Sequence, residues 1–119
     1  MNQARRARGE LEAQVLHVLW DARDGLTAKQ IGDRLPGAAP AHTTVLTALD
    51  RLSTKGHVVR DDQQRGITFR AARSEEEHVS RTMLDQLQSS SNREAALLHF
   101  FGHLDDEDAE LLRRSLRKG

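Results

Sequence analysis

Apolar residues near the start of the chain recur at the spacing of two successive helices. From Glu10 to Ala22 they fall every three or four positions, which is the period of an amphipathic helix, and Asp24-Gly25 ends it. The run Thr27-Ala28-Lys29-Gln30 is typical of a capping box, in which the first side chain accepts from a backbone amide and the fourth reaches back. A short second helix is therefore predicted from this box to the stop at Pro36-Gly37.

A third helix is predicted to carry Pro40 in its first turn, where the missing amide proton is not needed. It runs to Thr54 or Lys55, and Gly56 ends it in a left-handed conformation. Its apolar stripe consists of Val45, Leu49 and Leu52, with Ala41 and Ala48 beside them. The opposite face is polar and carries Thr43, Thr47, Asp50 and Thr54, flanked by Thr44 and Arg51.

The period then changes from helical to alternating. His57-Val58-Val59-Arg60 predicts a strand, residues 61–66 form a polar turn, and Ile67-Thr68-Phe69-Arg70-Ala71 predicts a half-buried return strand. Three helices followed by a hairpin is the order of elements in a winged helix-turn-helix, and the short link between the second and third helices agrees with it.

The remaining residues predict three more helices. Ser74 and Glu77 form a second capping box, Ser91 and Glu94 form a third, and Asp105-Asp106 starts the last helix. The predicted fold class is therefore mainly α with a small β-hairpin. We expect a winged helix-turn-helix DNA-binding domain over residues 1–73 and a C-terminal helical dimerisation domain over residues 74–119.

The charges are unevenly distributed although the 18 basic and 18 acidic residues cancel. Residues 1–73 hold 12 Lys/Arg and 8 Asp/Glu, a net charge of +4, whereas residues 74–119 hold 6 and 10, a net charge of −4. A basic first half favours a nucleic-acid-binding surface. With three Phe, one Trp and no Tyr, the chain lacks the aromatic platforms on which single-strand binders stack bases. Without cysteine it has no disulfide or thiolate metal site.

The second half carries more large apolar residues than three short helices can bury alone. A segment of this size rarely folds by itself, so these residues need a partner surface. A second copy related by a two-fold axis is the commonest solution, and we predict a homodimer. The alternative is one compact monomer with these helices folded back. The predicted dimerisation residues are Met83, Leu84, Leu87, Leu97, Leu98, Phe101, Leu104, Leu112 and Leu116.

The third helix of a winged helix lies in the DNA major groove, where residues near its start touch base edges. Threonine hydroxyls can donate or accept, and threonine or leucine methyl groups can contact the thymine methyl. The alternative is a polar surface helix that carries several threonines by chance. Threonine is, however, a poor helix former and is unfavourable on an ordinary solvent-exposed helix face. The predicted reading residues are His42, Thr43, Thr44, Leu46, Thr47 and Arg51.

Phosphate contacts are expected from the starts of the second and third helices, around Thr27 and His42, and from Lys29, Lys55 and Arg51. Arg65, at the tip of the hairpin, can reach a phosphate or the minor groove, and it is nearly as well explained as a solvated turn residue. Arg5, Arg6 and Arg8 form either an arm on the DNA backbone or a disordered end, and the sequence does not separate these two readings.

Three runs of this sequence carry a family resemblance. They are ELEAQVLHVLW over residues 10–20, LTA over residues 26–28, and HTTVLTALDRL over residues 42–52, the last followed by Lys55-Gly56. Over about residues 9–116 the chain resembles the BlaI/MecI penicillinase-repressor family. The resemblance implies a homodimeric winged-helix repressor on a palindromic double-stranded DNA operator, typically of a β-lactamase or penicillin-binding-protein gene. It also places Thr43, Thr44, Thr47 and Arg51 on the family's recognition helix.

The resemblance further implies a partner. In the best-known members, a membrane sensor with a metalloprotease domain cuts the repressor between an Asn and a Phe. By alignment that bond is His99–Phe100 in this chain, with His in place of Asn. The copper-responsive relatives carry a Cys-rich C-terminus, which this chain lacks.

Three other functions compete with a repressor. A metalloenzyme would use His99 and His103, one turn apart, with Asp105 or Asp106, but the His-Glu-x-x-His arrangement is incomplete. A ligand-sensing winged-helix regulator of another family would need a pocket near Met83, Leu87, Phe100 and Phe101. A purely structural interaction module is the third. We therefore predict a cytoplasmic DNA-binding repressor without enzymatic activity, metal, cofactor or membrane insertion.

Overall fold

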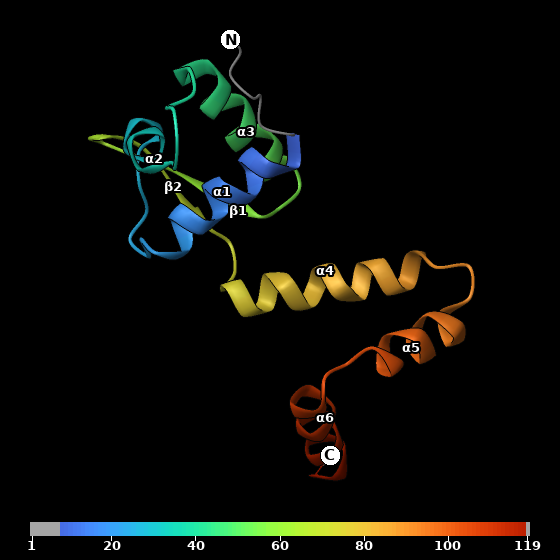
Figure 1. Cartoon of the computed structure of the whole chain (residues 1–119). Helices are drawn as coiled ribbons and strands as arrows, with labels where there is room; N and C mark the ends of the chain where they lie inside the picture. The colour runs from blue at the N-terminus through green and yellow to red at the C-terminus, as the bar shows by residue number, and fades with distance from the viewer. Residues whose placement is uncertain (1–7, 119) are drawn as a thin grey trace. The chain divides into compact units, whose positions relative to one another are not determined.

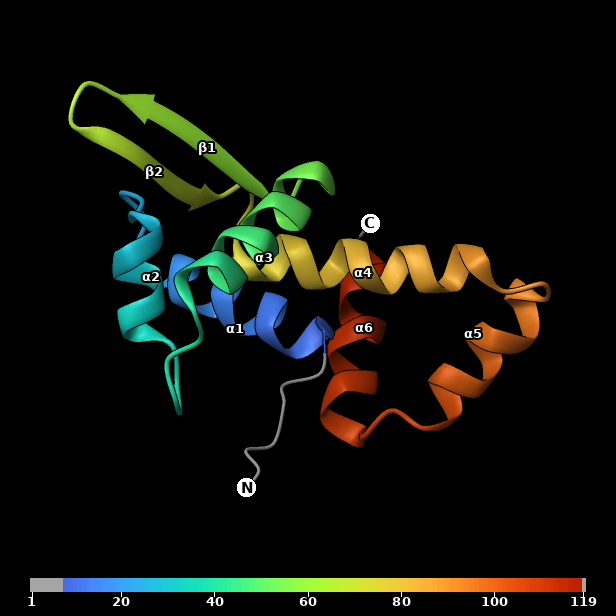
Figure 2. The same ribbon diagram turned by 90° about the horizontal axis from the view of Figure 1, so that it is seen from above.

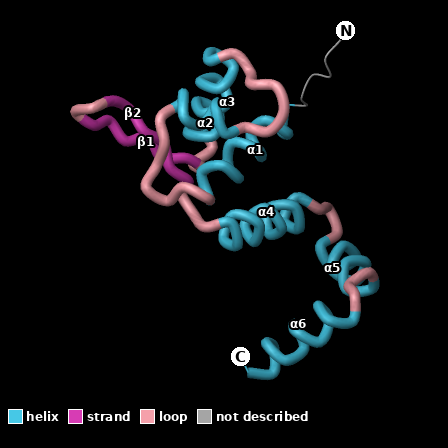
Figure 3. Tube along the Cα trace, turned by 60° about the vertical axis from the view of Figure 1, so that its left-hand side comes forward, coloured by secondary structure: helices cyan, strands magenta, loops and turns pink. Residues whose placement is uncertain are grey.

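The structure is a computed structural model and describes residues 8–118 of the chain. Over this range the elements are α1 (Arg8–Trp20), α2 (Ala28–Arg34), α3 (His42–Thr54), β1 (Val58–Gln63), β2 (Gly66–Ala71), α4 (Glu75–Ser89), α5 (Arg93–Gly102) and α6 (Asp106–Lys118) (Figures 1 and 3). The predicted fold class, mainly α with a small hairpin, is confirmed. Backbone contacts divide the chain into two compact units, Met1–His78 and Val79–Gly119, so the first turn of α4 belongs to the first unit.

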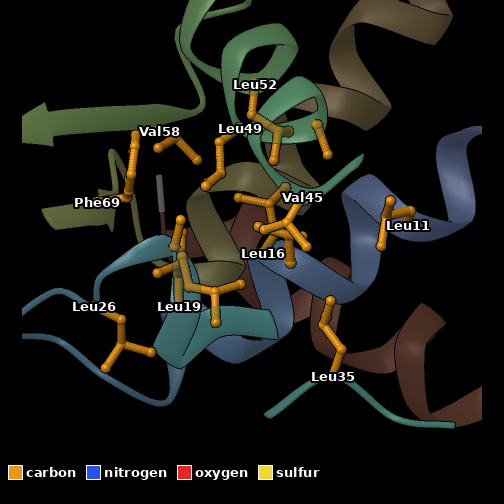
Figure 4. Close-up of a cluster of buried hydrophobic side chains, with 14 residues drawn as sticks. Leu11, Leu16, Leu19, Leu26, Leu35, Val45, Leu49, Leu52, Val58 and Phe69 are labelled. Atoms are coloured by element: carbon orange, nitrogen blue, oxygen red, sulfur yellow. The ribbon is translucent and has the colours of Figure 1, made fainter. Parts of the chain in front are cut away.

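The core of the first unit lies between α1, α2, α3 and the hairpin (Figure 4). Its deepest side chains include Val15, Ile31 and Leu49, which come from three different helices and are at most 1% exposed. Burying one such side chain stabilises the fold by about 1.5–3 kcal/mol. The complete core is Leu11, Val15, Leu16, Leu19, Leu26, Ala28, Ile31, Leu35, Val45, Ala48, Leu49, Leu52, Val58 and Phe69.

The caps of α2 and α3 decide where these helices begin. The predicted capping box of α2 is present, since Thr27 Oγ1 accepts from the Gln30 amide at 3.1 Å and Gln30 Oε1 accepts from the Thr27 amide at 2.9 Å. The predicted start of α3 was wrong, because Ala41 is the N-cap and Pro40 precedes it outside the helix. Ala41 is consequently exposed and not beside the apolar stripe. Gly56 ends the helix region with a φ of +80°, as predicted.

The hairpin is longer than the sequence predicts. The two strands pair antiparallel from Val58 opposite Ala71 to Gln63 opposite Gly66, so only two residues form the turn. The turn end extends beyond the helices of the first unit (Figure 2). Gly66 has a φ of +134°, a conformation that side-chain-bearing residues rarely adopt.

Two long-range contacts bind the hairpin and its exit to the helices. Leu26 forms a β-bridge with Phe69, in which Leu26 N donates to Phe69 O at 2.9 Å and Phe69 N donates to Leu26 O at 2.8 Å. Trp20 Nε1 donates to Arg73 O at 3.1 Å, which fixes the segment just before α4 against the end of α1. Both contacts join residues far apart in sequence.

The second unit consists of most of α4 together with α5 and α6. Ser74 and Glu77 form the predicted capping box of α4, because Ser74 Oγ accepts from Glu77 N and Glu77 Oε1 accepts from Ser74 N, both at 3.2 Å. The predicted Ser91 cap of α5 was wrong. Asn92 is the N-cap, and its Oδ1 accepts from Ala95 N at 3.0 Å. Asp105 caps α6 by accepting from Asp108 N at 2.8 Å.

Candidate nucleic-acid interface

The sequence of α3 gives this helix two different faces. Val45, Ala48, Leu49 and Leu52 are buried in the core and fix the helix against α1 and α2. The predicted reading residues all lie on the remaining surface and are exposed: His42, Thr43, Thr44, Leu46, Thr47 and Arg51. A rigidly held helix with an exposed polar face is what insertion into a major groove requires.

Thr47 is the best defined of these side chains. Its Oγ1 donates to the Thr43 carbonyl oxygen at 2.9 Å, one turn earlier. The hydroxyl hydrogen is therefore engaged within the helix, and the side chain presents an acceptor and a methyl group outward. These groups fit an amino group on a base edge or a thymine methyl.

A groove of about 350 Å³ separates α3 from the hairpin. Leu46, which is 40% exposed, lines it together with Thr47 and Asp50 of α3 and Arg60 of β1. The apolar side chain of Leu46 is thus available beside the polar face. Its contact to a thymine methyl stays a prediction.

The predicted phosphate ligands differ in what already engages them. Arg65 lies in the exposed turn of the hairpin and forms no ion pair with any residue that the structure describes. By contrast, the Arg60 side chain pairs with Asp62 at 3.0 Å. Lys29 pairs with Asp33 at 3.4 Å across one helical turn, and both side chains are mostly exposed, so water and salt weaken this pair.

Lys55 has a structural partner that the sequence analysis missed. Its Nζ lies 2.7 Å from Glu12 Oε1, where the Glu12 side chain is 9% exposed and the Lys55 side chain 53%. This pair ties the end of α3 to α1. No local pattern could have found it, because the two residues are 43 positions apart.

The apolar residues of the second unit are mostly uncovered. No residue from 79 to 117 is buried, and the predicted dimerisation residues include Leu98 at 65% and Leu116 at 73% exposure. Met83, Leu84 and Phe101 are also exposed, whereas Leu87, Leu97, Leu104 and Leu112 are half-buried. Val79 and Leu111 were not among the predicted dimerisation residues, and they are 47% and 55% exposed.

An open groove of about 560 Å³ lies between α4 and α5. Met83, Leu84 and Leu87 line it from α4, and Leu97 and Phe100 from α5. These are largely the residues predicted for dimerisation, so the groove belongs to the same apolar face.

His99 and Phe100, the predicted cleavage bond, are both exposed on α5. The rings of His99 and His103 stack with their centroids 6.3 Å apart, and His103 Nδ1 lies 2.8 Å from His99 O. Asp105 and Asp106 do not complete a site with them, since within residues 8–118 no group of three or more His, Asp or Glu side chains is placed to hold a metal ion.

These features together define a winged helix-turn-helix DNA-binding protein. Its third helix is held by the core and exposes a polar face, and a two-stranded wing follows it. None of the helices in the described part of the chain has the length and apolar character needed to cross a membrane.

Comparison with known proteins agrees with this class. The chain matches the model of the family described as penicillinase repressor over residues 8–118. It is 33% identical over 112 residues to the transcriptional regulator BlaI of Mycobacterium tuberculosis strain CDC 1551 / Oshkosh, and to the same extent to that of strain H37Rv. The match covers 91% of this chain and 81% of each relative. The chain belongs to the penicillinase repressor family; it is a DNA-binding transcriptional repressor and not an enzyme.

Proposed function

We propose that this repressor binds a palindromic operator as a homodimer, with the two copies of α3 in successive major grooves. The observation that carries the proposal is the exposed polar face of α3, on which Thr43, Thr44, Thr47 and Arg51 lie together. Occupation of the operator then blocks transcription by excluding other proteins from the same DNA.

Base reading is assigned to the start and middle of α3. Thr47 offers its acceptor and methyl group, and Leu46 offers an apolar surface to a thymine methyl. Arg51, exposed and without an ion pair in the described chain, can donate two hydrogen bonds to a guanine or contact a phosphate. His42, Thr43 and Thr44 occupy the first turn, which approaches the base edges most closely.

Backbone contacts are assigned to residues around this helix. Arg65 at the tip of the wing is the most accessible, since it is exposed and unpaired among the described residues. The set is completed by Thr27 and Lys29 at the start of α2 and by Lys55 after α3. The ammonium group of Lys55 would contact a phosphate while paired with Glu12. Arg8 lies at the start of α1, whereas Arg5 and Arg6, the other members of the predicted arm, lie outside the described residues.

The homodimer is supported by the uncovered apolar face of α4, α5 and α6. Leu84, Leu98, Phe101 and Leu116 are each about half exposed or more, and this number of large uncovered apolar side chains favours an association site. Residues 74–119 carry a net charge of −4, so a dimer formed there adds no net positive charge. The basic first halves therefore remain the DNA-binding surfaces.

Family membership supports a target among β-lactam-response or related genes, and a role in the cytoplasm, where the genomic DNA lies. A membrane sensor protease that cuts His99–Phe100 is part of the same proposal, since this bond lies on exposed helix surface.

The alternative function is a ligand-sensing regulator, which would bind its ligand in the groove between α4 and α5. The proposed dimer covers the same residues.

Selection of bound sequences from random double-stranded DNA tests the proposal. We expect an inverted repeat whose half-site centres lie about one helical turn, or a multiple of it, apart. Binding should weaken steeply with salt, because phosphate contacts release counterions. Enrichment of a single unrepeated motif would contradict the homodimer, and failure to enrich any sequence would contradict specific base reading.

A further inference from the structure

Three of the six histidines join the tryptophan in a series of ring contacts, in which His17 and His78 lie against Trp20 and His57 lies against His78. The ring centroid of Trp20 lies 5.1 Å from that of His17 and 5.4 Å from that of His78, and the His57 and His78 centroids are 4.7 Å apart. We call His17, Trp20, His57 and His78 the histidine cluster. DNA reading uses none of these residues, and the sequence analysis did not bring them together.

The histidine cluster sits where the first unit passes into α4. His57 follows the end of α3, and His78 lies in the first turn of α4. The segment between them is held by two more hydrogen bonds: Ala72 N donates to His57 O at 2.9 Å, and Arg73 Nη1 donates to Gly56 O at 3.2 Å. With the Trp20–Arg73 bond, these contacts fix the start of α4 to the ends of α1 and α3.

The groups that face His57 make its protonation unfavourable. Its Nδ1 is buried and has no hydrogen-bond partner among the described residues, so an added proton there finds no acceptor. Burial and then the neighbouring His78, Lys55 and Arg73 lower the pKa of His57, and only Glu12 opposes them. From α4, Glu75, Glu76 and Glu77 precede His78 in the same turn.

We propose that the histidine cluster is a pH-sensitive catch, which holds the first turn of α4 on the DNA-binding unit at neutral pH and releases it on acidification. Neutral His57 and His78 pack edge to face against each other, whereas two imidazolium rings at this separation repel. A proton on His57 therefore favours the released form, in which its buried ring regains water.

The output of this catch rests on the proposed function. In a dimer joined through α4, the attachment of the first turn of α4 determines how firmly each DNA-reading unit is positioned. Release makes the two α3 helices less well positioned for one operator, so acidification lowers operator affinity. The signal is a proton, sensed between about pH 5 and 7, where histidine changes its charge.

The first experiment follows the catch without DNA. NMR titration of the imidazole protons should place the pKa of His57 below the ordinary histidine value of about 6.5. His78→Gln should raise it, because a neighbouring imidazolium is removed. Trp20 fluorescence should change over the same pH range, since imidazolium quenches indole. Because Trp20 also contacts His17, the variant His17→Gln separates quenching by His17 from quenching by His78. If the pKa of His57 is the same in wild type and in His78→Gln, the proposal is overturned.

The second experiment measures operator affinity at about pH 7.5 and about pH 5.5, on either side of the ordinary histidine pKa. Wild type is compared with the double variant His57→Gln/His78→Gln, and His99→Gln in the second unit is the control. Any contribution of His42 at the DNA is common to all three proteins, so it cancels in the comparison. We expect the acid-induced loss of affinity to be at least about threefold larger in wild type and in His99→Gln than in the double variant.

Equal pH dependence in wild type and in the double variant would overturn the proposal. Circular dichroism at about pH 7.5 tests whether the double variant folds. If the double variant does not fold, the single variant His78→Gln takes its place. Absence of specific DNA binding by wild type at neutral pH would instead refute the proposed function. The DNA-free titration would still decide whether the catch exists.

Discussion

Replacing Lys55 with methionine removes the ammonium that faces the Glu12 carboxylate at 2.7 Å and keeps most of the aliphatic stem. Glu12 Oε2 is already buried without a partner, so the variant leaves the whole carboxylate unpaired. Breaking a fully buried pair costs about 3–5 kcal/mol, and an exposed pair is worth under about 1 kcal/mol. Because Glu12 is buried and Lys55 is half exposed, we expect the free energy of unfolding to fall by about 2 kcal/mol.

Urea unfolding followed by Trp20 fluorescence measures this loss, which corresponds to a midpoint lower by about 1 M. Lys29→Met is the matched control, because its pair with Asp33 spans 3.4 Å between largely exposed side chains and should cost under about 0.5 kcal/mol. Adding Glu12→Gln to Lys55→Met should recover part of the stability, since no carboxylate is left buried. Equal midpoints for Lys55→Met and Lys29→Met would refute the reasoning.

Three further predictions concern DNA, association and pH. Thr47→Ala should weaken operator binding about fivefold or more with little effect on random DNA, as measured by fluorescence anisotropy; equal losses on both would remove Thr47 from base reading. Phe101→Asp should convert the proposed dimer into a 13.4 kDa monomer in sedimentation, because it places a charge in the apolar face; sedimentation unchanged from that of a wild-type dimer would place Phe101 outside the interface. Burial and the His78 charge lower the pKa of His57, so the unfolded chain binds the proton more tightly; stability in urea should therefore be full above about pH 6.5 and decline below it, and a rise on acidification would contradict this.

Local patterns predicted the elements of this protein well and their long-range contacts poorly. The apolar period located α1 and α3 because each helix buries one stripe, as Val15 and Leu49 illustrate. The end of β1 was missed because its last residues are polar on both faces and show no alternation. Ser91 and Asn92 are adjacent residues with equally good capping side chains, so only the structure separates them.

The candidate site shows the same division. The exposed face of α3 follows from its helical period, so the exposure of the residues predicted to read bases could be predicted from the sequence, while their base contacts stay a prediction. The Glu12–Lys55 pair could not, because it depends on how α1 packs against α3. Nor could the histidine cluster, since its members come from α1, from the residue before β1 and from α4, and each of its three histidines alone resembles an ordinary surface histidine.

One consequence concerns α4, whose first turn belongs to the first unit and whose remainder belongs to the second. An α-helix of 15 residues is about 22 Å of stiff rod, unlike a glycine-rich linker that absorbs displacement. In the proposed dimer, α4 is the covalent connection between the association surface and each reading unit, and this connection contains no glycine. Thermodynamic reciprocity then requires that an operator of the right spacing tighten the association between protomers by the same factor by which association tightens DNA binding.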